Sequence, residues 1–80
     1  MEDLRQCRIV IRESAKGDTI ADTTILESNV ETGEIVVAIE GFALAQGDTI
    51  SALIFSKSGL YETQGTIGVL QDQRITIALY

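Results

Sequence analysis

The sequence has no histidine, no proline and no tryptophan, and it has a single cysteine. Without histidine, the chain lacks the usual general base and the commonest protein ligand of metal ions. Cys7 has no partner for an intramolecular disulfide, and its alternation with Ile9 and Ile11 is typical of a small buried apolar residue, not a nucleophile. No phosphate loop and no G-x-G-x-x-G motif is present. We therefore expect no enzyme activity, no metal site and no cofactor.

Long apolar runs are also lacking. The longest aliphatic run covers residues 35–39, whereas a membrane-spanning helix needs roughly twenty apolar residues. Glu2 and Asp3 stand near the N-terminus, where a secretory signal carries basic residues followed by an apolar run. We therefore expect a cytoplasmic protein without a membrane span.

Basic residues are scarce, with 6 Lys and Arg against 12 Asp and Glu and a net charge of −6. A surface of that sign repels phosphate backbones, so we expect no binding to nucleic acid polymers. The acidic surplus lies mostly in residues 1–40. The first half is therefore where a partner attracted by charge is expected to dock.

Glycine and short polar turns divide the chain into six apolar runs of strand length, at residues 6–12, 19–26, 34–39, 48–55, 61–70 and 74–79. Eighty residues leave room for one hydrophobic core. The sequence therefore predicts one all-β domain over residues 1–80, a six-stranded antiparallel (split) β-barrel. Residues 19–26 are weakly patterned, which predicts an edge strand, and residues 34–39 are apolar on both faces, which predicts a covered central strand.

Two-residue alternation predicts which side chains point into the barrel. The predicted interior consists mainly of β-branched aliphatic residues, namely Ile9, Ile11, Val37, Ile50, Ala52, Ile54, Ile67, Val69, Ile75 and Ile77. Gly65 and Gly68 interrupt the fifth run, which predicts a bulge or sharp bend there.

A short internal echo is also present. Gly17-Asp18-Thr19-Ile20 recurs as Gly47-Asp48-Thr49-Ile50, each time before a predicted strand. Turn chemistry explains the echo, because glycine permits the turn and aspartate caps it. A duplicated half-barrel is the alternative.

Two arginines on the first predicted strand are candidate ligand-binding residues. Arg8 and Arg12 lie four positions apart on one strand face, and paired guanidinium groups can bind a phosphate or carboxylate in fork geometry. The alternative is that both are solvent-facing residues paired with the surplus acids.

Apolar side chains on the non-core faces of the third and fourth predicted strands indicate a protein interface. The interface prediction comprises Val36, Ala38, Leu53 and Phe55, together with Tyr61 as an aromatic that packs across the sheet or serves as a binding platform.

The second half resembles a known family. Gly47-Asp48-Thr49-Ile50, then Phe55, then Gly59-Leu60-Tyr61-Glu62-Thr63-Gln64-Gly65-Thr66-Ile67 are similar to the N-terminal β-barrel domain of flagellar-brake proteins, which precedes a PilZ domain in cyclic di-GMP receptors. The resemblance implies an interaction module in cyclic di-GMP-dependent motility control, whose partner is a PilZ domain or a motor protein. The nucleotide-binding motifs of PilZ domains do not occur in these residues, so any effect of cyclic di-GMP on this chain is expected to be indirect.

Two other functions are compatible with a small barrel. One is a self-associating barrel without a ligand. The other is a split barrel that binds a flavin-like ligand at a dimer interface, which six scattered bases disfavour because a flavin phosphate needs clustered polar contacts. It is also an alternative that Phe42, Leu44 and the chain ends fold over the predicted interface and cover it.

Overall fold

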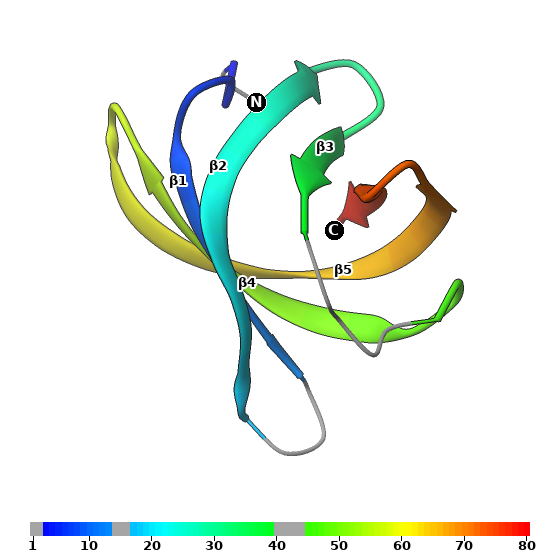
Figure 1. The fold of residues 1–80 in the computed structure, drawn as a ribbon. Coiled ribbons are helices and arrows are strands. Elements are labelled where there is room, and N and C mark those ends of the chain that lie inside the picture. Colours follow the sequence, from blue (N-terminus) through cyan, green and yellow to red (C-terminus); the bar gives the residue numbers. More distant parts are fainter. Residues whose placement is uncertain (1–2, 14–16, 40–44) are drawn as a thin grey trace.

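The computed structural model describes residues 3–13, 17–39 and 45–80. Its six strands are β1 (Arg8–Glu13), β2 (Thr19–Asn29), β3 (Glu34–Ala38), β4 (Thr49–Ser56), β5 (Gly59–Gln71) and β6 (Arg74–Leu79). All neighbouring strands are antiparallel and close into a barrel in the order β1-β2-β3-β6-β5-β4 (Figure 1). The predicted fold class is confirmed. The described residues include no helix long and apolar enough to cross a membrane.

The prediction of an edge strand at residues 19–26 is wrong. β2 pairs with β1 on one side and with β3 on the other, because closure of a sheet removes its edges. The weak patterning of β2 has two local causes. Its inward positions include the small residues Ala21 and Thr23, which pair with Ile11 and Ile9, and a bulge follows Ile25.

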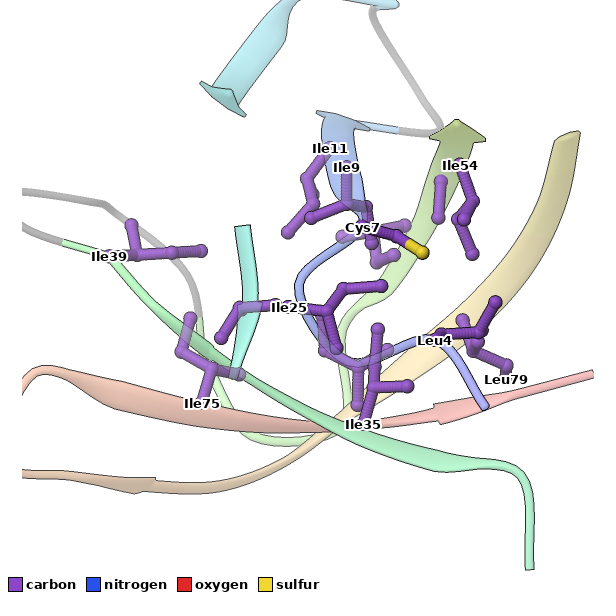
Figure 2. Close-up of a cluster of buried hydrophobic side chains, with 14 of the residues drawn as sticks. Leu4, Cys7, Ile9, Ile11, Ile25, Ile35, Ile39, Ile54, Ile75 and Leu79 are labelled. Atoms are coloured by element: carbon purple, nitrogen blue, oxygen red, sulfur yellow. The ribbon is translucent and has the colours of Figure 1, made fainter. Parts of the chain in front are cut away.

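The barrel interior is almost wholly aliphatic, and Figure 2 shows its side chains gathered from several strands. Among the described residues no polar or charged residue is buried. Cys7 is buried, as predicted, in this cluster. Leu4 is fully buried although it precedes β1, and its N–H donates to the Ser28 Oγ at 3.2 Å. Alternation could not predict the burial of Leu4, because Leu4 lies outside any strand.

Nine of the ten predicted interior residues are buried, and Val69 is the exception. The bulge predicted near Gly68 lies between Ile67 and Leu70. It shifts the alternation by one residue, so Leu70 packs against the core and Val69 is 56% exposed. The prediction that β3 is covered on both faces is also wrong, because Ala38 on its outer face is exposed.

The barrel consists of two equivalent halves, the meanders β1-β2-β3 and β4-β5-β6, which are joined by the β1–β4 and β3–β6 ladders. In each half, the long middle strand carries a bulge where it pairs with the third strand, and β2 and β5 curve around the barrel (Figure 1). Backbone hydrogen bonds repeat between the halves. Each bond below is written as the residue whose N–H donates, then the residue whose carbonyl oxygen accepts. A bond in the first half is followed by its equivalent in the second half: Gln6–Ile25 (2.9 Å) and Gly47–Ile67 (2.8 Å), Ile25–Cys7 (2.9 Å) and Ile67–Asp48 (2.8 Å), Cys7–Leu4 (3.1 Å) and Asp48–Ala45 (3.1 Å), and Ile39–Gln73 (2.9 Å) and Leu79–Gly33 (3.0 Å).

These repeats define a pseudo-two-fold axis. The axis passes through the pair Ile11–Ala52, between β1 and β4, and leaves the barrel through the pair Val36–Thr76, between β3 and β6. The echoed Gly-Asp-Thr-Ile does not follow this symmetry, because it precedes β2 in one half and β4 in the other. Turn chemistry therefore explains the echo, since Gly17 and Gly47 both have positive φ.

Two glutamines occupy left-handed backbone positions whose equivalents in the other half are glycines. Gln6 has φ 69° and its equivalent Gly47 has 94°, while Gln73 has 62° and its equivalent Gly33 has 77°. Left-handed backbone costs a non-glycine residue about 1–2 kcal/mol, which exceeds the entropic cost of glycine in the unfolded chain. We predict that Gln6→Gly and Gln73→Gly each raise the free energy of unfolding by about 0.5–1 kcal/mol, measured by urea unfolding. Gln64→Gly, in extended β5, is the control and should destabilise.

Gly65 is required by the packing of the barrel. A Cβ built on Gly65 would lie 2.8 Å from the Ile77 Cγ2 and 3.0 Å from the Ala78 carbonyl oxygen. Because this overpacking forces a backbone shift, we predict that Gly65→Ala lowers the free energy of unfolding by about 1–3 kcal/mol. The adjacent, exposed Gln64→Ala should change it by less than about 0.5 kcal/mol. Equal stability of the two variants in urea unfolding would contradict this assignment.

Candidate functional site

The candidate site is a sheet surface, which we call the outer β1–β4 face. It comprises the outward side chains of β1, β4 and the start of β5, namely Arg8, Val10, Arg12, Leu53, Phe55, Leu60 and Glu62. Strand register sets them in rows, because outward residues that pair across a ladder share one face. One row runs Leu60, Phe55, Arg8, and the next runs Glu62, Leu53, Val10.

The centre of this face is apolar. Val10, Leu53 and Phe55 are half-buried on neighbouring strands, and Leu60 is 58% exposed. Directly paired side chains on a sheet have Cβ atoms about 4.5–5.5 Å apart, so these four residues form one continuous patch. A continuous exposed apolar patch is typical of a contact surface for another macromolecule.

Arg8 is held in place beside this patch. Its Nε donates to the Asp22 Oδ1 at 2.9 Å and its Nη2 donates to Oδ2 at 2.6 Å, the two-pronged geometry of strong Arg–carboxylate pairs. Its guanidinium carbon lies 4.8 Å from the centre of the Phe55 ring, which adds a cation–π contact. The hydrogen bonds from Arg8, assisted by its charge, lower the pKa of Asp22 below its ordinary value of 3.8.

The structure does not join Arg8 and Arg12 into one clamp. Both lie on the outer side of β1, but four residues of strand separate their Cα atoms by about 13 Å. Arg12 has no ion-pair partner among the residues that the structure describes, whereas Arg8 is paired with Asp22. Simultaneous contact with one phosphate would require Arg8 to leave Asp22. Ligand binding by the two arginines stays a prediction.

The five predicted interface residues fall into three places. Leu53 and Phe55 lie together on the outer β1–β4 face. Val36 and Ala38 lie on β3, which is three strands from β4 in either direction around the ring. Tyr61 pairs with inward-facing Ile54 and packs against the core, so its side chain is on the inner side of the sheet.

Sequence reasoning omitted two members of the patch, Val10 and Leu60. The sequence does contain a signal for Val10, because two-residue alternation places its side chain on the face opposite to Ile9 and Ile11. Leu60 lies just before the predicted strand at residues 61–70. Only the two-residue hairpin loop, which lets Gly59 pair with Ser56 and Leu60 with Phe55, brings it onto the face. Phe42 and Leu44, which in the alternative prediction fold over the interface, lie outside the described residues.

The chemistry available on this face is binding chemistry. Within residues 3–13, 17–39 and 45–80, no group of three or more Asp, Glu, Cys or His side chains is placed to hold a metal ion. The apolar patch offers desolvation energy, and Arg8 and Glu62 at its margin offer charged hydrogen bonds to a partner.

No family model matches the chain, and no match was found among curated proteins.

The Arg8–Asp22 pair predicts a specific pH response. The folded-state pKa of Asp22 is below its unfolded value, so the pair stabilises the fold above about pH 4 and this contribution is lost as the pH falls through the lowered pKa. We predict that Arg8→Gln raises the pKa of Asp22 toward 3.8, measured by NMR titration of its carboxyl carbon. Asp3 is the internal control, because hydrogen bonds from Arg5 lower its pKa and Arg8 takes no part. An unchanged Asp22 titration would contradict the pairing.

Proposed function

We propose that this chain is a non-enzymatic protein-interaction module that docks on a partner domain through the outer β1–β4 face. The observation that carries the proposal is the continuous patch of Val10, Leu53, Phe55 and Leu60 on the outside of the barrel. The core needs none of these side chains, because it is filled from the inner face. Their burial by a partner is a source of binding energy that the isolated chain leaves unused.

Arg8 and Phe55 strengthen this surface as a docking site. Arginine and aromatic residues are enriched among the residues that dominate binding energy. Asp22 and the Phe55 ring fix the Arg8 guanidinium in the free protein. A side chain that is already ordered loses less entropy when a partner binds, which favours association.

The partner we propose is a PilZ domain, and the process is cyclic di-GMP-dependent control of flagellar motility in the cytoplasm. This rests on the resemblance to the N-terminal domain of flagellar-brake proteins. The six-stranded barrel is compatible with that resemblance, and two residues that carry it, Phe55 and Leu60, lie on the outer β1–β4 face. In this proposal the nucleotide binds the partner and affects this chain indirectly.

A net charge of −6 works against docking of two copies of the chain, because like charges repel at close approach. For this reason we place a different protein, not a second copy, on the outer β1–β4 face. Self-association is the outcome that the experiment below separates from it.

We predict that the chain binds an isolated PilZ domain of a flagellar-brake protein, and that Leu53→Asp and Leu60→Asp each weaken binding at least about tenfold in calorimetry. Leu60 is 58% exposed, so its variant tests binding without disturbing the fold. The matched control is Val30→Asp, which changes an exposed apolar residue in the turn between β2 and β3. This variant should bind the PilZ domain as tightly as the parent does.

Two results would count against the proposal. One is the absence of binding by the parent chain at concentrations up to a millimolar. The other is a concentration-dependent dimer in sedimentation velocity that Leu53→Asp abolishes, which would assign the face to self-association.

A further inference from the structure

A groove crosses the barrel surface where the pseudo-two-fold axis leaves between β3 and β6. It consists of two adjoining hollows of about 620 and 560 Å³. Both hollows are lined by Glu27, Val36 and Thr76, so they form one continuous depression with the Val36–Thr76 pair at its centre. We call it the β3–β6 groove. It lies on the opposite side of the ring from the outer β1–β4 face.

The two hollows are related by the symmetry of the barrel. Asn29 and Glu34 line the first, and their equivalents Gln71 and Arg74 line the second. Each hollow lies beside a bulge, after Ile25 in β2 and after Ile67 in β5. A bulge bends its strand, so a bulge on each side of the β3–β6 ladder accounts for a depression along it.

The outward residues differ between the two halves, so the two ends of the groove carry different charged groups. The first hollow carries three carboxylates, Glu27, Glu31 and Glu34, and none of them has an ion-pair partner among the described residues. In the second hollow, Arg74 stands at the position of Glu34 and Val69 at the position of Glu27, while Glu27 itself and Asp72 also line it. One end of the groove therefore carries three carboxylates. The other end holds the guanidinium of Arg74, which has no ion-pair partner among the described residues, together with the Asp72 carboxylate.

Aliphatic side chains line the groove between these charges. Val30 at the acidic end is 45% exposed, Val69 at the other end is 56% exposed, and Val36 forms the middle. Apolar surface and charge thus alternate along its length. An extended polypeptide matches this arrangement, because it presents alternate side chains to one face at intervals of about 6.6 Å.

We propose that the β3–β6 groove binds an extended segment of a partner protein, with basic side chains against Glu27, Glu31 and Glu34, an aliphatic side chain over Val36, and an acidic side chain beside Arg74. The carboxylates exclude a nucleic acid, whose phosphates they repel. The site is independent of the proposed function, because it lies on another face and takes a different partner. With both faces occupied, the barrel is a two-sided adaptor.

The probe for the test is the peptide acetyl-Arg-Ser-Arg-Ser-Val-Ser-Glu-amide, whose extended form places both arginines, the valine and the glutamate on one face. It is titrated into the full chain at low salt and followed by amide NMR shifts. We expect saturable, sub-millimolar binding, with shifts confined to β2, β3, β6 and the end of β5. Glu27→Gln and Glu34→Gln should each weaken binding about three- to fivefold, since each removes one exposed charge pair. Added salt should weaken it further.

Three controls isolate the claim. Glu62→Gln makes the same charge change on the outer β1–β4 face and should leave the affinity unchanged. Leu53→Asp, which tests the proposed function, should also bind the peptide normally, so the two proposals can fail separately. A peptide with the same residues in reverse order places its basic end beside Arg74 and should bind several-fold more weakly.

The proposal is overturned if the peptide does not saturate below a millimolar, or if Glu62→Gln weakens binding as much as Glu27→Gln does. Equal affinity for spermine would likewise overturn it, because charge alone, without a polypeptide, would then account for binding.

Discussion

The narrow interior of a six-stranded barrel is the constraint on which the rest of this structure depends. Eight strands leave just enough room for side chains to fill a barrel, and six leave less. The chain meets this limit with inward isoleucines and Val37, and with Gly65 where even a methyl group would meet Ile77. Because side chains alternate along a strand, filling the inside in this way also decides which residues are left on the outside.

Barrel closure and the pseudo-two-fold arrangement of the strands together create two surfaces of different chemistry. The pseudo-two-fold axis places the β1–β4 and β3–β6 ladders on opposite sides of the barrel. Several backbone hydrogen bonds repeat in both halves, but the outward residues differ. Arg12 and Leu53 are equivalent across the axis, as are Glu34 and Arg74. One side therefore becomes an apolar patch beside arginines, and the other a groove with carboxylates at one end and Arg74 beside Asp72 at the other.

The charged residues follow the same division. Arg8 is fixed by Asp22 and the Phe55 ring, which orders the surface next to the apolar patch. The carboxylates of Glu27, Glu31 and Glu34 are without ion-pair partners among the described residues and line an open hollow. Ordered charge beside apolar surface favours docking of a folded domain, whereas free charge in a groove favours a segment of complementary charge. Both arrangements suit binding, which is why we propose that the chain is an adaptor.

The sequence by itself determined the six strands, the antiparallel barrel and nearly all of the core, because alternation and turn residues are local signals. It also located the acidic surplus in the first half, where Glu27, Glu31 and Glu34 line the groove. Tertiary structure alone decided what depends on pairing between distant segments. The bulge in β5 turned Val69 outward, and barrel closure placed β2 between two neighbours. The strand order separated Val36 from Leu53, and only hydrogen bonds between strands revealed the two-fold repeat, since register is set across the sheet and not along the chain.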